Sequence, residues 1–309
     1  MFIKGTLKRV LQKAYRLAVQ DDAPVTEEKL ALGHFHRVDQ GTQILLRLKY
    51  EEMLRNNVPL PSLSDVEFRC FSQNGEDGIL LFLFALIGTT NKRVVEICAG
   101  NGIECNSANL IINHGWRGLL VDGSEENVAA GKKFYDKHKD TWLTPPTLVS
   151  AWITRENVDQ LITSQGFAGE IDLLSVDLDG NDYWIWEAIE STRPRLVVVE
   201  HNLLLGADRP VTIPYRENFV ADLSGPHYYC GASLAAFVKL GRQKGYRLVG
   251  AERRGFNAFF ARAGVGEDVL PELTVEQCVG REFLFNAGPL TEAQRDTLKM
   301  MSGWELVEV

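Results

Sequence analysis

The sequence lacks a long hydrophobic run and an excess of positive charge. Its longest apolar stretch, Ile79 to Gly88, is shorter than the ~20 residues that cross a bilayer, and Glu76 and Asp77 directly precede it. The formal net charge is −8. A general nucleic-acid-binding protein normally carries a net basic domain, so we expect no nucleic-acid partner.

Cysteine is also scarce. The chain has five cysteines, an odd number, and no two of them form a Cys-x-x-Cys pair. This excludes the usual patterns of a disulfide framework and of a zinc ribbon. A reducing compartment, the cytoplasm, fits this cysteine usage best.

What is present is an ordinary globular composition, with 45% hydrophobic and 24% charged residues among 309. Residues 1–65 predict a helical extension, and residues 66–309 predict one α/β domain. Within residues 1–19, basic and apolar side chains are interleaved so that they fall on opposite faces of a helix, which is unlike a secretory signal. Such a helix either lies on an anionic membrane, here the inner face, or packs on its own domain.

From residue 67 onward, short apolar runs alternate with helical patterns. The runs predict five strands at 93–99, 118–121, 147–153, 171–176 and 196–200. Near-continuous apolar strands separated by helices indicate a parallel sheet that is buried on both faces. A helix at 233–244 and two closely spaced strands at 246–249 and 257–261 follow, which predicts a terminal hairpin. We therefore expect a Rossmann-like α/β fold of five parallel strands closed by an antiparallel hairpin.

A glycine-containing loop follows the first of these strands. Gly100 and Gly102 lie where ligands bind in doubly wound sheets, and Asp122 ends the second strand, where an acid accepts bonds from ribose hydroxyls. A dinucleotide site needs a third glycine, but Cys105 stands there, beside the acidic Glu104. The pattern favours a cofactor without phosphate, whose cationic groups acidic neighbours such as Glu96 would stabilise.

Acidic residues gather after the fourth and fifth strands. Asp177, Asp179 and Asp182 follow the fourth strand, and Glu200 ends the fifth. Adjacent parallel strands are ~4.8 Å apart, so these ends meet at one edge of the sheet. Oxygen ligands there suit Mg²⁺ or Mn²⁺; the alternative is that the acids only cap helices or bind a cofactor amine. The expected metal ligands are Asp179, Glu200, His201 and Asn202.

Two residues at this edge are candidate general bases, Asp182 and His201. Either side chain, placed beside carboxylates at the ligand edge, could accept a proton from a substrate hydroxyl.

In combination, five segments resemble FkbM-type methyltransferases, over about residues 68–262. They are SQNGEDGIL (72–80), VVEICAGNGIECNSANLIINHGWRGLLVDGSEEN (94–127), IDLLSVDLDGNDYWIWEAI (171–189), RPRLVVVEHN (193–202) and GASLAAFVKLGRQKGYRLVGAERRGFNAFFAR (231–262). The resemblance implies a class I methyltransferase fold, S-adenosylmethionine as cofactor and, commonly, methylation of sugar hydroxyls in a saccharide or glycoconjugate.

The resemblance also implies residue roles. We expect the cofactor to be bound by Ser72, Gln73, Glu96, Gly100, Gly102, Asn106, Asp122, Ser124 and Asp177. Related macrolide-sugar O-methyltransferases bind Mg²⁺ at positions that match Asp179, Glu200 and His201, and their histidine base falls on Asp182. In those enzymes an acid stands where this chain has His201.

Two other functions fit parts of the same pattern. One is a nicotinamide-dependent oxidoreductase, against which the missing third glycine and the terminal hairpin count. The other is a non-catalytic interaction module of glycan assembly, which would not bind S-adenosylmethionine.

Overall fold

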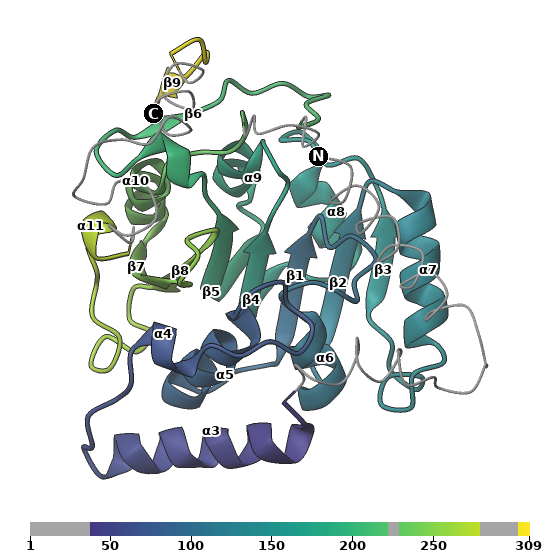
Figure 1. Ribbon diagram of the computed structural model, residues 1–309. Helices are drawn as coiled ribbons and strands as arrows, with labels where there is room; N and C mark the ends of the chain where they lie inside the picture. Colours follow the sequence, from purple (N-terminus) through teal and green to yellow (C-terminus); the bar gives the residue numbers. More distant parts are fainter. Residues whose placement is uncertain (1–37, 222–228, 279–301) are drawn as a thin grey trace, which may run out of the picture. The chain divides into compact units, whose positions relative to one another are not determined.

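The computed structural model describes residues 38–221, 229–278 and 302–309. The residues from Asp39 onward belong to one compact unit (Figure 1). The amphipathic pattern of residues 1–19 lies outside the described residues. The division of the chain at residue 65 therefore stays a prediction.

A seven-stranded sheet forms the centre of this unit, in the order β3-β2-β1-β4-β5-β8-β7. Its strands are β1 (Arg93–Ile97), β2 (Arg117–Asp122), β3 (Thr147–Ser150), β4 (Gly169–Val176), β5 (Thr192–Glu200), β7 (Tyr246–Ala251) and β8 (Asn257–Arg262). The first five are parallel, and β8 runs antiparallel to both β5 and β7. The expectation of five parallel strands closed by a hairpin is confirmed.

Helices cover both faces of the sheet (Figure 1). One face carries α5 (Glu76–Ile87), α6 (Ala108–His114) and α7 (Glu125–Tyr135), and the other carries α8 (Val158–Ser164), α9 (Asp182–Ala188) and α10 (Leu234–Lys244). The second group packs on a large apolar cluster that includes Val95, Leu174 and Phe260. Burying these aliphatic and aromatic side chains is the main source of stability of such a three-layer fold.

Two helices precede α5, namely α3 (Gln40–Arg55) and α4 (Leu63–Val66). Asp39 begins α3 by accepting a hydrogen bond from the Thr42 amide at 3.0 Å, which satisfies one of the free N–H groups of a helix start. From α3, the buried Gln43 exchanges hydrogen bonds with Asn109 of α6. Both α3 and most of α4 lie within residues 1–65, for which the sequence predicts a helical extension.

The remaining described elements are short and lie outside the central sheet. They are η1 (Leu203–Leu205), β6 (Val211–Thr212), α11 (Val275–Cys278) and β9 (Val307–Glu308). β6 and β9 pair antiparallel, so the last described residues lie against the segment that follows β5. None of the helices in the described ranges is long and apolar enough to cross a membrane.

The ladder register determines which side chains share a face. Glu96 is paired with Ser175, and Ser175 with Val198. Since side chains alternate along a strand, this face continues at the carboxyl ends to Asp177 and Glu200. Neighbouring residues such as Ile97, Val176 and Val199 point into the apolar cluster instead. The sheet thus ends in a row of polar groups on the side covered by α5 and α6.

Candidate functional site

The loop after β1 has an unusual backbone. Cys98, Gly100 and Gly102 all have φ near +60°, a region that non-glycine residues seldom adopt. A Cβ on Gly102 would come within 2.8 Å of Leu120, whereas one on Gly100 would meet nothing within 4 Å. Gly102 is required for packing, and Gly100 presents its backbone to open space. A ligand can therefore approach the main chain at Gly100.

Asp122, at the end of β2, is tied to this loop. Its carboxylate accepts hydrogen bonds from the amide of Gly100 at 2.9 Å, the amide of Ser124 at 2.9 Å and the side chain of Asn127 at 3.0 Å. Ser124 also begins α7 by accepting from the Asn127 amide. Carboxylate oxygens have about four acceptor sites in total, so Asp122 can still take a ligand hydroxyl.

Glu96 is buried, and both of its oxygens are engaged by the same loop. They accept hydrogen bonds from the amides of Asn106 and Ser107, each at 2.8 Å. The Asn106 side chain in turn donates to the hydroxyl of Ser175 on β4 at 3.1 Å. In this geometry Glu96 and Asn106 hold the loop against the sheet. Direct contact of either with a cofactor stays a prediction.

The segment before α5 approaches the edge from the β8 side. The Asp77 carboxylate accepts from the amides of residues 70, 71 and 72, while the buried Ser72 hydroxyl accepts from the Asp77 amide at 3.2 Å. Gln73 is exposed at the tip of this turn. These bonds fix the turn that presents Ser72 and Gln73.

Two further residues at the edge escaped the sequence analysis, Asn257 and, as a site residue, Glu76. Glu76 is completely buried and accepts from the Asn257 side chain at 2.9 Å. Asn257 is the ladder partner of Glu200. Asn257 can be recognised as a neighbour of this edge only from the register of the hairpin. Glu76 could have been found from the sequence, because the acidic pair Glu76-Asp77 follows Gly75 at the start of an apolar helix.

The carboxylates of Asp177, Asp179 and Glu200 form a compact group. One oxygen from each lies within 4.8 Å of the others, and no other such group of metal-ligand side chains occurs in the described ranges. Burial and the neighbouring acids raise the pKa of Asp177 to about 8, and the same causes raise the pKa of Glu200 well above its usual value. Like charges this close favour either a bound proton or a bound cation. The structure thus groups Asp179 and Glu200 as expected, with Asp177 as the third member.

Asp182 lies behind this group as the first residue of α9. It is fully buried, and its two oxygens accept from the amides of Leu178 and Gly180. These bonds hold the turn in which Asp179 takes φ = 52°. Burial raises the pKa of Asp182 to about 6. This geometry fits a residue that positions Asp179, and a role of Asp182 as a base stays a prediction.

His201 and Asn202 do not join the carboxylate group. The Asn202 side chain accepts from the Leu204 amide at 3.0 Å and donates to the Cys230 carbonyl at 2.9 Å, so it shapes the chain after β5. The His201 ring is buried, and neither ring nitrogen has a hydrogen-bond partner in the described part of the chain. Burial lowers the pKa of His201 to about 4, which leaves the ring neutral at pH 7. His201 is not a member of the group of three carboxylates, and the binding of a metal by His201 or Asn202 stays a prediction.

Comparisons with known proteins bear on the architecture. No protein-family model matches the chain, and no curated protein is significantly similar to it. Among solved structures, the methyltransferase domain of bacterial CtHen1-C is 16% identical, with a TM-score of 0.38 over 55% of this chain and 89% of that one. The glycopeptide N-methyltransferase MtfA with S-adenosylmethionine is 12% identical, with a TM-score of 0.35 over 56% and 87%. The small RNA methyltransferase HEN1 is 15% identical, with a TM-score of 0.40 over 59% and 24%.

At these identities and scores, the likeness assigns neither a substrate nor a reaction to this chain. The fold is defined by the strand order itself. Five parallel strands closed by an antiparallel hairpin, with helices on both faces, are the Rossmann-like fold of class I methyltransferases.

Proposed function

We propose that this protein is an S-adenosylmethionine-dependent O-methyltransferase that acts on a sugar hydroxyl of a saccharide or glycoconjugate, assisted by a divalent cation. The observation that carries the proposal is the arrangement of one sheet edge. There, an open glycine backbone that follows β1 and is bonded to Asp122 lies beside the group of three carboxylates at the ends of the next two strands, β4 and β5.

The cofactor half of the proposal rests on charge. A pyrophosphate would be repelled by the acids at this edge, whereas the ammonium and sulfonium of S-adenosylmethionine would be attracted to them. Asp122 supplies acceptors for ribose hydroxyls, and the backbone of Gly100 leaves room for the sugar. This favours S-adenosylmethionine over a nicotinamide dinucleotide.

The cation half rests on donor chemistry. Carboxylate oxygens are hard ligands that suit Mg²⁺ or Mn²⁺. Asp177, Asp179 and Glu200 would hold the ion, and its charge would offset the repulsion that raises their pKa values. When bound, a divalent cation orients neighbouring hydroxyls and lowers the hydroxyl pKa. Asp182 would keep Asp179 in place through its bonds to the turn.

Between the two base candidates, the contacts favour His201. Its two ring nitrogens are unpartnered within the described residues, so a ring lone pair is available to accept a proton. Asp182 could accept one only by giving up the bonds that hold the turn at Leu178 and Gly180. We therefore retain His201 as the proposed base and assign Asp182 a positioning role.

Calorimetric titration of the purified protein tests the cofactor, with S-adenosylhomocysteine and NADH as separate ligands. We expect saturable binding of the first and none of the second. Binding of NADH alone would establish the oxidoreductase alternative, and binding of neither would leave the non-catalytic module.

Transfer of labelled methyl from S-adenosylmethionine to a panel of saccharides tests the reaction. We expect transfer to be lost on chelation and restored by Mg²⁺ or Mn²⁺. Transfer that survives exhaustive chelation would refute the role of the cation while leaving the methyltransferase reaction in place.

A further inference from the structure

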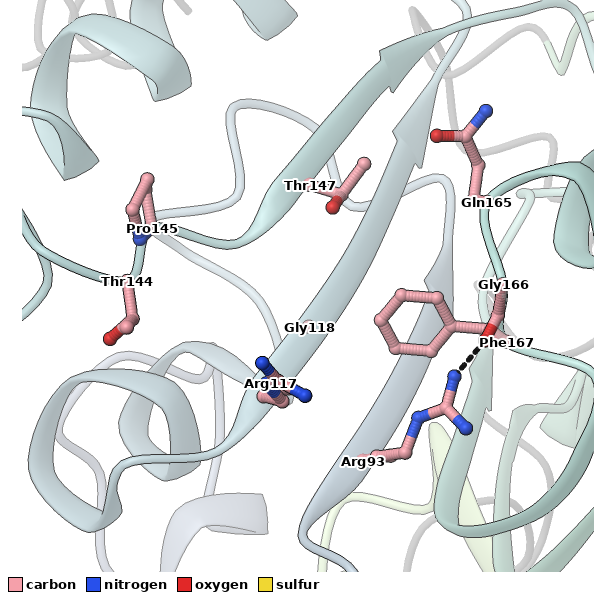
Figure 2. A pocket seen from close by; sticks show the side chains of 9 residues that line it. All are labelled: Arg93, Arg117, Gly118, Thr144, Pro145, Thr147, Gln165, Gly166 and Phe167. Atoms are coloured by element: carbon pink, nitrogen blue, oxygen red, sulfur yellow. Dashed lines mark hydrogen bonds between the residues drawn. The ribbon is translucent and has the colours of Figure 1, made fainter.

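A second cavity lies at the opposite, amino-terminal edge of the sheet, away from the proposed methyl-transfer site. It has a volume of about 520 Å³ and is lined by Arg93, Arg117, Gly118, Thr144, Pro145, Thr147, Gln165, Gly166 and Phe167 (Figure 2). The lining contains two arginines and no carboxylate. In a chain of net charge −8, this is a locally cationic recess.

The two arginines are ladder neighbours. Arg93 begins β1, Arg117 begins β2, and the two residues are register partners. Partners in a parallel ladder project from the same face, and adjacent strands are ~4.8 Å apart. Thr147, the first residue of β3, shares that face because its ladder partner is Leu119, two residues after Arg117. Three neighbouring strands thus contribute polar side chains to one recess.

Arg93 is fixed in place. Its guanidinium donates to the carbonyl of Gly166 and stacks on the ring of Phe167, with 4.6 Å to the centroid (Figure 2). Stacking and a hydrogen bond on one side leave its other N–H groups for a ligand.

The Arg117 side chain, by contrast, is exposed and makes no hydrogen bond or ion pair within the described part of the chain. On β4, Asp172 precedes Leu173, the ladder partner of Val94, and so lies level with Arg93 in the register. Its carboxylate is already engaged by the amides of Thr90, Asn91 and Lys92 and by Arg195. Nothing in the described lining neutralises Arg117.

Two like charges at opposed ladder positions destabilise a sheet unless an opposite charge joins them. An anion between the guanidiniums would remove this repulsion and receive bidentate hydrogen bonds. Thr144, Thr147 and Gln165 also line the cavity and carry neutral donors, although the Gln165 amide donates to the Ser164 hydroxyl at 3.4 Å. This combination matches the several acceptor oxygens of a phosphate group.

We propose that this cavity is a binding site for a phosphate ester. Arg117 is its principal anion-binding residue, Arg93 is the second charge, and Thr147 donates a hydroxyl. The ligand is either a free phosphorylated small molecule or the headgroup of an anionic lipid. The exposed side chains of Trp142 and Leu143, at 58% and 73% exposure, precede Thr144 in the chain and would suit a lipid surface.

Titration of the full chain with glycerol 3-phosphate at 150 mM NaCl tests the site. We expect saturable binding that glycerol does not reproduce. Arg117→Gln should weaken it at least tenfold, Thr147→Val should weaken it less, and Arg117→Lys should recover part of the affinity. Arg55→Gln is the matched control, because Arg55 is an exposed arginine at the end of α3. The thermal midpoint of each variant reports whether it is folded.

Phosphatidylglycerol vesicles then distinguish the source. Displacement of glycerol 3-phosphate by the vesicles supports a lipid headgroup, and continued binding in their presence supports a free phosphate ester. No saturable binding by the native chain, or equal binding by folded Arg117→Gln, would overturn the proposal. The affinity for S-adenosylhomocysteine should be the same in native protein and Arg117→Gln, which separates this site from the proposed function.

Discussion

Replacing Asp179 with asparagine should stabilise the protein when divalent cations are absent. The substitution keeps the side-chain shape and removes two of the three like-charge pairs among carboxylates that lie within 4.8 Å. At that distance two ionised carboxylates repel by about 3.5 kcal/mol at an effective dielectric constant of about 20. Asp179 is exposed, and the raised pKa values mean that the group holds a proton part of the time. We therefore expect a gain of about 1–2 kcal/mol in the free energy of unfolding.

The same substitution should abolish the response to cations. A cation that binds only the folded state adds about 2.7 kcal/mol at a concentration of one hundred times its dissociation constant. For a protein of this size, a change of 1 kcal/mol moves the thermal midpoint by about 2–4 °C. Native protein should therefore melt several degrees higher in Mn²⁺ than in chelator. Asp179→Asn should melt at one temperature in both, above that of native protein in chelator.

The assay is thermal or urea unfolding of native protein, Asp179→Asn and Asp268→Asn, each in chelator, Mg²⁺ and Mn²⁺. Asp268 is an exposed carboxylate outside the group, so its variant should behave as native protein does. Two results together would refute this reasoning: Asp179→Asn is less stable than native protein in chelator, and the thermal midpoint of native protein is the same with and without Mg²⁺ or Mn²⁺. They would show that these acids neither repel one another strongly nor bind a metal.

Four further predictions follow from the contacts. Asp122→Ala should weaken the binding of S-adenosylhomocysteine at least tenfold, measured by calorimetry, because each lost hydrogen bond to a carboxylate is worth about 1.5–3 kcal/mol. Asp268→Ala should leave the affinity unchanged. Equal affinities of native protein and Asp122→Ala would refute the proposed bond between Asp122 and the ribose. The amides of residues 90–92 and the Thr90 hydroxyl outweigh burial and lower the pKa of Asp172. The stabilisation that ionised Asp172 gives the fold is therefore present above pH ~4 and is lost as pH falls through the lowered pKa of the folded state. Asp172→Asn should lower the free energy of unfolding by about 3–5 kcal/mol at pH 7, measured by urea unfolding. His201→Leu should stop turnover without lowering stability, and unchanged turnover would exclude His201 as the base. Native protein should lose stability as pH falls from about 6.5 to about 4, because the pKa of His201 is lower in the folded than in the unfolded state; His201→Leu should not show this loss. Deletion of residues 1–19 should abolish sedimentation of the protein with anionic vesicles and preserve its affinity for the cofactor. If the full chain does not sediment with such vesicles even at low salt, residues 1–19 do not bind an anionic membrane.

The strands and the terminal hairpin could be predicted from the sequence because each strand is a short apolar run that ends in polar residues, whereas the order of the strands in the sheet comes from the structure. Asp122 and Gly100 were found for the same reason, since the end of a strand locates a side chain without knowledge of packing. The acids after β4 and β5 were also identified. Their grouping at one edge follows from strand spacing alone.

Side-chain direction beyond the end of a strand could not be predicted. Glu200 belongs to β5 and keeps its ladder direction, but Asn202 begins a turn and bonds to Cys230 instead. The pattern did not reveal that Asp177 joins Asp179 and Glu200, or that the amides of Leu178 and Gly180 engage both oxygens of Asp182. The contact of Asp177 with a cofactor and the role of Asp182 as a base stay predictions.

The loop after β1 is held at several points by the protein alone. Asp122 binds the Gly100 amide, Tyr135 donates to the Gly102 carbonyl, and Glu96 binds the amides of Asn106 and Ser107. A ligand that arrives there meets a preorganised backbone and has little chain to order, so association should lose little conformational entropy. The bound and free loops should then show nearly the same amide hydrogen exchange, with the change on binding concentrated in the side chains of the acidic edge.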